Sequence, residues 1–276
     1  MNQRDFPYDT LAPQGFSLAG RNALITGGAG HLGAALSAGL AAAGARVHLL
    51  GRNEDKLSTV VESIRSRGHE ADYSVLDLTN MAAVQAFTAE YTAQGQELDI
   101  LVNNAYAGPT GTLEAATPKN YSDSYQIAVV VAAELVRGLL PSFRHAVQVR
   151  GDASVINIAS MYGHVSPDPA IYGTSGQNSP PYYGAAKGAL LQYTRYAAVH
   201  LAAERIRVNA ISPGPFPPLR FRDDKPDFYK ELVGKAPLGR IGLPEDLIGP
   251  LVFLASPSAQ YVTGINLPVD GGWTTW

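Results

Sequence analysis

The chain has 276 residues, of which 46% are hydrophobic and 16% are charged, and its formal net charge at pH 7 is -3. This size allows one large hydrophobic core or two small ones. The absence of a basic run argues against nucleic acid as a partner. Cysteine is absent, which excludes disulfides, thiolate nucleophiles and cysteine-ligated zinc. The six histidines form no ligand-spaced cluster, so no metal site is expected.

The N-terminal segment MNQRDFPYDT lacks the apolar core of a secretory signal. No apolar run approaches the ~20 residues of a membrane span. We therefore expect a cytoplasmic protein that has no membrane partner and acts on a small-molecule substrate.

Short apolar runs alternate along the chain with longer helical patterns. The expected strands are 23–25, 47–50, 98–102, 154–158, 207–211 and 265–269, and the expected helices are 32–43, 55–67, 81–93, 121–140, 183–203 and 245–255. This alternation predicts an α/β fold, a single Rossmann-type doubly wound parallel sheet of about seven strands flanked by helices.

The expected organisation is an N-terminal extension (1–15) followed by one dinucleotide-binding and catalytic domain (16–276). Two Pro-rich stretches interrupt the alternation just beyond strand ends, where open α/β sheets bind ligands. We therefore expect substrate loops at 161–182 and 213–236.

A glycine-rich segment, TGGAGHLG from Thr26 to Gly33, follows the first expected strand and precedes an alanine-rich helix. Glycines permit a tight turn and the close approach of backbone N–H groups to a pyrophosphate at the helix N-terminus. An ordinary strand-to-helix turn is the alternative, but the position after the first strand favours dinucleotide binding. The expected contacts are Gly27, Gly30, His31, Leu32 and Gly33.

The end of the second expected strand bears on the choice of cofactor. A carboxylate there would bind the adenosine ribose hydroxyls of NAD, whereas an arginine accepts a 2′-phosphate. The chain has Arg52 followed by Asn53, which favours NADP(H) over NAD(H). The alternative for Arg52 is a solvated residue before the second helix.

Tyr183 and Lys187 lie four positions apart on an expected helix and so share one face. Positive charge on Lys187 would favour the phenolate of Tyr183 and lower its pKa from about 10 toward neutrality. Such pairs also arise by chance, and a packing role is the alternative for Tyr183. Tyr182 is turned about 100° away from Tyr183, which predicts packing or pocket lining.

With these segments in order, the chain resembles a classical short-chain dehydrogenase/reductase from about Phe16 to Gly272. The resemblance rests on TGGAGHLG, on DILVNNA from Asp99 to Ala105, on Ser160 with YGAAK from Tyr183 to Lys187, and on NAISPG from Asn209 to Gly214. Asp77 in the segment LDLT, the C-terminal segment PLGRIGLPEDLIGPLVFLAS and VTGINLPVDGG also match. Together these motifs are specific, whereas any one alone is not.

The resemblance implies a mechanism and a set of site residues. Ser160, Tyr183 and Lys187 fall on the catalytic residues: serine binds the substrate carbonyl, tyrosine protonates it, and lysine holds the nicotinamide ribose and keeps the tyrosine acidic. The other implied cofactor contacts are Asp77, Leu78, Asn104, Ala105, Pro213, Gly214 and Phe216. The resemblance also implies a homo-oligomer, dimer or tetramer, that pairs through helices and the C-terminal segment.

Four positions depart from the family pattern. His31 replaces a glycine and would contact phosphate or begin the first helix facing solvent. Tyr106 replaces a glycine and would shape the pocket or cover the sheet edge. Ala128 stands where a helix asparagine holds a relay water, and Gln126, about 200° away on a regular helix, makes a poor substitute. Pro218 stands where a threonine binds the carboxamide, which leaves backbone groups around Phe216 for that contact.

The interval from Ser160 to Tyr183, 23 positions, is about ten longer than is usual in the family. Its prolines and glycines predict a defined loop beside the substrate, and the alternative is a loop that packs against a neighbouring subunit. The polar residues Asp168, Tyr172, Ser175, Gln177 and Asn178 would suit a hydroxyl-rich, sugar-like ligand. The expected substrate contacts are Tyr106, Met161, Tyr172 and Asn178.

Three functional hypotheses follow. The first is an NADP(H)-dependent ketoreductase or alcohol dehydrogenase, an oxidoreductase that transfers hydride between the nicotinamide and a carbonyl or secondary alcohol. The second is an epimerase or dehydratase that retains its cofactor. The third is a catalytically weak NADP-binding regulatory protein, which the departures at His31, Ala128 and Pro218 would explain.

Overall fold

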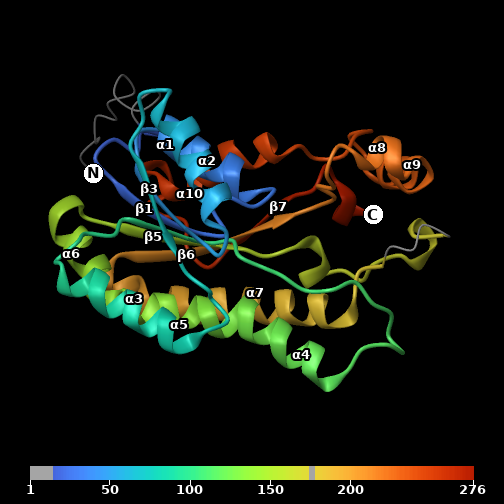
Figure 1. The fold of residues 1–276 in the computed structure, drawn as a ribbon, viewed down its shortest axis with the longest axis horizontal. Coiled ribbons are helices and arrows are strands. Elements are labelled where there is room, and N and C mark those ends of the chain that lie inside the picture. Colours follow the sequence, from blue (N-terminus) through green and yellow to red (C-terminus); the bar gives the residue numbers. More distant parts are fainter. Residues whose placement is uncertain (1–14, 174–177) are drawn as a thin grey trace, which may run out of the picture.

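The centre of the molecule is a seven-stranded parallel sheet with strand order β3-β2-β1-β4-β5-β6-β7 (Figure 1). The computed structural model describes residues 15–173 and 178–276. The strands are β1 (Asn22–Thr26), β2 (Arg46–Gly51), β3 (Ala71–Val75), β4 (Ile100–Asn103), β5 (Ala153–Ile158), β6 (Ile206–Pro213) and β7 (Asn266–Val269). The expected doubly wound α/β fold is thus confirmed, because the order reverses between β1 and β4.

Helices connect the strands and cover both faces of the sheet (Figure 1). They are α1 (Gly33–Ala42), α2 (Glu54–Arg65), α3 (Met81–Ala93), α4 (Pro118–Tyr125), α5 (Val131–Gly138), α6 (Leu140–Arg150), α7 (Pro181–Leu201), α8 (Phe221–Asp224), α9 (Pro226–Lys235) and α10 (Ile248–Ala255). The expected helix 121–140 is interrupted: α4 and α5 are joined by a π-helical turn, Gln126–Val130.

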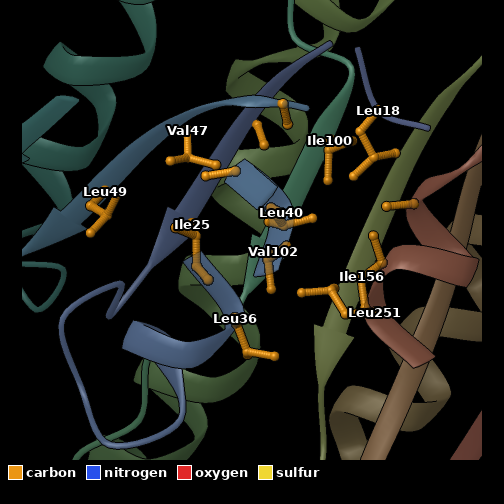
Figure 2. Close-up of a cluster of buried hydrophobic side chains, with 14 of the residues drawn as sticks. Leu18, Ile25, Leu36, Leu40, Val47, Leu49, Ile100, Val102, Ile156 and Leu251 are labelled. Atoms are coloured by element: carbon orange, nitrogen blue, oxygen red, sulfur yellow. The ribbon is translucent and has the colours of Figure 1, made fainter. Parts of the chain in front are cut away.

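Two apolar layers fix the helices on the sheet. On one face α1, α2 and α10 bury Leu40, Val61 and Leu251 against β1, β2 and β4. Figure 2 shows Leu40 and Leu251 in this layer. On the other face α3, α5, α6 and α7 form a second layer with the opposite sides of the same strands. A fully buried leucine or phenylalanine contributes about 1.5–3 kcal/mol, so these layers hold the strand ends in place for the site above them.

The edge strand β3 was absent from the expected strands. Of its five residues only Ala71 is buried, because the strand has a neighbour, β2, on one side only. Its sequence is accordingly polar, and the apolar-run signal fails there. By contrast, every residue of the inner strand β6 is buried.

A third apolar cluster lies beyond the carboxyl ends of the strands. It joins the segment after β5 to α8 and α9 through Met161, Ile171, Phe228 and Leu232. Figure 1 shows α8 and α9 at this end of the sheet, near the C-terminus. The cluster therefore forms one wall of the region where ligands bind in such folds.

Within the described part of the chain, no single helix is long and apolar enough to cross a membrane. One pair would reach that length together, Pro118–Gly138 with Leu140–Arg150, and it is bent by 57°.

Candidate active site

A cavity of about 810 Å³ opens at the carboxyl ends of the strands, across the point where the strand order reverses. Most of the expected site residues line it. They are Gly27, Gly30, His31, Leu32, Gly33, Arg52, Asp77, Leu78, Asn104, Ala105, Tyr106, Ser160, Tyr183, Lys187, Pro213, Gly214 and Phe216. Residues from six strand ends thus meet in one cavity.

The glycine-rich turn needs its glycines for steric reasons. Gly27 has φ of +62°, and a Cβ on Gly33 would lie 2.0 Å from the Gly27 carbonyl oxygen. Helix α1 begins there, and the side chain at its N-cap, Leu32, makes no capping hydrogen bond. Glycines at a helix N-terminus leave room for the pyrophosphate of a dinucleotide to approach the backbone N–H groups.

Asn104 holds this turn in place. Its Nδ2 donates to the carbonyl oxygens of Thr26 at 3.0 Å and Gly27 at 3.2 Å, and its backbone N–H donates to Thr26 Oγ1 at 2.9 Å. The side chain therefore fixes the shape of the glycine-rich turn across the junction of β1 and β4.

At the adenosine end, Arg52 lines the cavity and is exposed. Two hydrogen bonds from Thr79 lower the pKa of Asp77, and the nearby charge of Arg52 lowers it further. Asn53 does not line the cavity; its Oδ1 accepts the Lys56 backbone N–H at 2.8 Å. Asn53 is the N-cap of α2, and its contact with the cofactor stays a prediction.

His31 is exposed in the turn before α1, and its contact with phosphate stays a prediction. It precedes α1, lines the cavity, and its Nε2–H donates to the Phe216 carbonyl oxygen at 3.0 Å. Because Phe216 belongs to the loop after β6, this hydrogen bond joins two walls of the cavity.

Ser160, Tyr183 and Lys187 are brought together at the inner end of the cavity. Ser160 follows β5, is buried, accepts the Tyr162 backbone N–H at 3.2 Å on Oγ, and forms a side-chain hydrogen bond with Tyr183. Lys187 is also buried, and its Nζ donates to the Ile158 carbonyl oxygen at 2.6 Å. Serine, phenol and ammonium thus face the same space.

The pKa of Tyr183 is opposite in direction to the expectation. Burial raises it above its ordinary value of about 10, and a hydrogen bond with Ser160 lowers it by less. Burial also lowers the pKa of Lys187 to about 7. The expected acidification of Tyr183 by Lys187 is not seen among the protein's own groups, because burial is the largest cause of both pKa shifts and neither shift includes a contribution from the other side chain.

Hydrogen-bonded side chains set the register of α7 on the sheet. Asn103 Nδ2 donates to Asn157 Oδ1 at 2.8 Å, Asn157 Nδ2 donates to Thr194 Oγ1 at 2.9 Å, and Thr194 Oγ1 donates to the Leu190 carbonyl oxygen. This chain ties β4 and β5 to the helix that carries Tyr183 and Lys187.

The π-helical turn changes which side chain of this segment reaches the cavity. Gln126, at its start, lines the cavity, whereas Ala128 is 4% exposed and packs with Ala132 and Leu190. The separation of about 200° between the two positions holds for a regular α-helix, and the π-helical turn departs from that geometry. That Gln126 makes a poor substitute for the relay asparagine stays a prediction.

The expected substrate contacts divide. Tyr106 lines the cavity, but Met161, Tyr172 and Asn178 do not. Met161 is buried in the third apolar cluster. The Tyr172 ring stacks on Phe228 at 5.8 Å, and its hydroxyl donates to that of Tyr162. These two residues therefore pack in the cluster with α9, outside the cavity lining. Ser175 and Gln177 lie outside the described residues.

Several cavity residues were missed by sequence reasoning. Lys119 and Asp123 on α4 form an ion pair of 2.8 Å and line the cavity. The other missed residues are Gly51, Leu76, Thr79, Ala107, Ile127, Ile158 and Ala159. Tyr182 packs, as expected: it is buried, and its hydroxyl donates to the Pro109 carbonyl oxygen at 3.0 Å.

Known proteins of this architecture resemble the chain in sequence and in fold. Residues 28–274 match the family model described as enoyl-(acyl carrier protein) reductase. A rhamnolipid-biosynthesis 3-oxoacyl-[acyl-carrier-protein] reductase of Pseudomonas aeruginosa is 32% identical, over 94% of this chain and 98% of its own.

Two solved structures extend the comparison. The Pseudomonas aeruginosa RhlG/NADP active-site complex has a TM-score of 0.85 and 31% identity, covering 95% of this chain and 99% of that one. A gluconate 5-dehydrogenase of Burkholderia cenocepacia in complex with NADP and tartrate has a TM-score of 0.83 and 31% identity, covering 95% and 98%. The chain therefore belongs to the classical short-chain dehydrogenase/reductase family of oxidoreductases.

Proposed function

We propose that the protein is an NADP(H)-dependent oxidoreductase that transfers a hydride between the nicotinamide and a carbonyl or secondary alcohol. The observation that carries the proposal is the meeting of Ser160, Tyr183 and Lys187 at one end of a cavity whose other end has a glycine turn and Arg52. Related structures with NADP bound support the choice of cofactor.

Each residue has a separate task in reduction. The Ser160 hydroxyl donates to the substrate oxygen, and Tyr183 gives its phenolic proton to the same oxygen. The bound nicotinamide supplies the hydride. Because burial raises the pKa of Tyr183, the phenol is protonated at neutral pH and ready to act as the acid. Lys187, directed by the Ile158 carbonyl oxygen, would hold the ribose hydroxyls.

The pKa direction also predicts how the reaction depends on pH. Oxidation of an alcohol requires the Tyr183 phenolate as the base, so its rate rises with pH toward the raised pKa. Lys187, whose pKa is about 7, loses its charge over the same rise. Neutral pH therefore favours reduction.

We further propose a polyhydroxylated or sugar-like substrate. The cavity rim carries polar side chains, among them Lys119, Asp123 and Gln126, which can pair with hydroxyl or carboxylate groups. The related gluconate 5-dehydrogenase structure, which contains tartrate, supports this class.

One observation favours the cofactor-retaining alternative. The hydrogen bond from His31 to Phe216 joins the glycine turn to the loop after β6 across the cavity, which would slow the release of a bound dinucleotide. An epimerase or dehydratase of this kind would form product without net consumption of NADPH.

The test replaces Tyr183 with phenylalanine in an assay over sugars, ketoses, keto acids and polyols. Removal of the acid lowers kcat by about 10²–10⁴-fold, while the Kd for NADPH, measured by calorimetry, changes little. Tyr182→Phe is the matched control, because its hydroxyl bonds a loop carbonyl; its kcat stays within a few fold.

Three results bear on the choice of function. No NADPH-dependent turnover of any compound, with tight NADPH binding, would favour a regulatory protein. Equal rates in the Tyr183→Phe variant and the parent would contradict the mechanism. Product formed at constant NADPH would favour the epimerase alternative.

A homo-oligomer, dimer or tetramer, and a cytoplasmic location complete the proposal. The exposed Tyr121 and Tyr125 on α4 and Tyr196 and Val199 on α7 support a helical interface. Analytical ultracentrifugation of the full chain tests the first point, and fractionation of the source cells tests the second.

A further inference from the structure

Tyr106 lies against both members of the proton-handling pair. Its ring meets the Tyr183 ring edge-on, with 4.8 Å between centroids and 71° between planes. The Lys187 Nζ lies 5.3 Å from the centroid of the Tyr106 ring, within the range of cation–π attraction. One side chain thus contacts the phenol and the ammonium at once.

The hydroxyl of Tyr106 anchors this ring. It shares a 2.8 Å hydrogen bond with Ser124 Oγ, which is buried on α4. Ser124 Oγ in turn bonds the backbone carbonyl of Tyr182 at 3.0 Å, the residue before Tyr183. The anchor therefore returns to the first turn of α7 and fixes the ring relative to Tyr183.

The small side chains behind the ring make room for it. Tyr106 packs against the cluster of Ala128, Val129, Ala132, Ala186 and Leu190, on the π-turn, α5 and α7. The Tyr106 ring is thus held on one side by a buried apolar cluster that includes Ala128.

We propose that Tyr106 is a positioning residue for the catalytic pair, whose ring stabilises the Lys187 ammonium and orients the Tyr183 phenol. The proposal extends the proposed hydride-transfer function and names a residue on which it depends. The Lys187 ammonium is buried, and an aromatic face is a way to stabilise a desolvated cation without adding a charged group.

Two aromatic rings and one carbonyl oxygen face the Lys187 ammonium. The centroid of the Tyr106 ring is the nearer, at 5.3 Å from Nζ, and that of the Tyr183 ring lies at 5.9 Å. The Ile158 carbonyl oxygen accepts a hydrogen bond from Nζ. The Lys119–Asp123 ion pair on α4 is exposed at the rim, and Gln126 from the π-turn is uncharged. Burial lowers the pKa of Lys187 to about 7, so a small stabilising contact alters its charge near neutral pH.

The test reads the ionisation of Lys187 directly and needs no substrate. The full chain contains six lysines, so ¹³Cε-lysine labelling gives a simple NMR spectrum, in which Lys187 is assigned by its loss in Lys187→Met. Tyr106→Leu removes the π face and keeps the site apolar, while Tyr106→Phe keeps the face and removes the hydroxyl. Tyr106→Met is a second variant without a ring, should Tyr106→Leu not fold.

We expect the Lys187 midpoint to fall by about half a pH unit or more in Tyr106→Leu or Tyr106→Met, a threefold change in the ionisation equilibrium. In Tyr106→Phe it stays within about 0.2 unit of the parent. Equal midpoints in all chains, or the same shift in Tyr106→Phe as in Tyr106→Leu, would overturn the proposal.

A kinetic arm links this residue to the proposed reaction. In the variants without a ring, kcat for carbonyl reduction falls at constant Kd for NADPH, and its descending alkaline limb moves to lower pH with the Lys187 midpoint. If the parent turns over no carbonyl compound, the proposed function fails, and the NMR titration still decides the role of Tyr106.

Discussion

Two regions at the carboxyl ends of the strands are built in different ways. The cofactor wall consists of short motifs at strand ends that line the cavity, such as the turn from Gly27 to Gly33 braced by Asn104. The substrate wall, beside which we propose that the substrate binds, is made by packing of residues outside the cavity lining: Asp168, after β5, is ion-paired with Lys235 at the end of α9, and Tyr172 stacks on Phe228. The first depends on backbone shape, and the second on side chains that meet only in the folded chain.

This difference predicts how each wall responds to change. A single added side-chain atom displaces the backbone where the cofactor wall is made of close backbone contacts. A wall held by several partly exposed side chains tolerates the loss of one of them. Three substitutions, taken from the largest expected effect to the smallest, test that contrast.

Gly33→Ala should have the largest effect, since its Cβ would lie 2.0 Å from the Gly27 carbonyl oxygen. Overpacking costs about 1–3 kcal/mol, and with the turn displaced we expect the Kd for NADPH to rise about tenfold or more. Calorimetry measures it. Gly234→Ala in α9 is the control, because a Cβ there meets no atom within 4 Å. An unchanged Kd in Gly33→Ala would refute the role of the glycine-rich turn in binding the pyrophosphate.

Arg52→Ala should have an intermediate and selective effect. A charge-assisted hydrogen bond to a 2′-phosphate contributes about 1.5–3 kcal/mol, so the Kd for NADPH rises about tenfold or more while that for NADH changes little. Binding of both cofactors to the parent and the variant gives the ratio. Arg67→Ala, an exposed arginine after α2, is the control, and an equal loss for NADPH and NADH in Arg52→Ala would disprove 2′-phosphate recognition.

Lys235→Met should have the smallest effect. Its ion pair with Asp168 is 42% and 38% exposed, and exposed pairs contribute about 0–1 kcal/mol. We expect KM for a hydroxylated substrate to rise two- to fivefold with kcat nearly unchanged. Lys230→Met, exposed on the same helix, should leave KM unaltered, and a large fall in kcat in Lys235→Met would place this ion pair in the catalytic machinery.

The same ion pair has a predictable pH dependence. The hydrogen bond from Lys235 lowers the pKa of Asp168. The stabilisation that this ion pair gives the fold is therefore fully present above the ordinary carboxyl pKa of about 3.9. It is lost as the pH falls through the lowered value. Between pH 6 and 9 the KM effect of Lys235→Met should therefore be constant.

What the sequence could predict follows the same division. Gly27, Gly33 and Ser160 occupy positions fixed by strand ends and local sterics, and they line the cavity as predicted. The edge strand β3 was not predicted from the sequence, because a half-exposed strand needs no apolar run. Met161 and Tyr172 were placed beside the substrate because of their position in the chain, yet they pack against α9, whose position depends on contacts across the fold.

The interruption between α4 and α5 shows a second limit. Regular helical geometry placed Gln126 about 200° from Ala128, whereas the two residues lie in a π-helical turn and Gln126 lines the cavity. Ala128 looked like the loss of a polar group, but in the fold it belongs to the apolar cluster against which Tyr106 packs. Both points depend on a backbone irregularity and a distant partner, neither of which residue spacing reveals.

The central claim is that Tyr183 acts as the acid in hydride transfer at this cavity. The most direct measurement uses NADPH deuterated at C4 of the nicotinamide, in both stereochemical forms, with hydroxylated ketones and keto acids, and follows deuterium into the product by mass spectrometry. We expect deuterium at the new carbinol carbon from one form of the cofactor only, in the parent and in Tyr182→Phe. In Tyr183→Phe we expect the rate of deuterium transfer to fall by about 100-fold or more. Transfer at the same rate in Tyr183→Phe, or no transfer to any carbonyl compound, would contradict it.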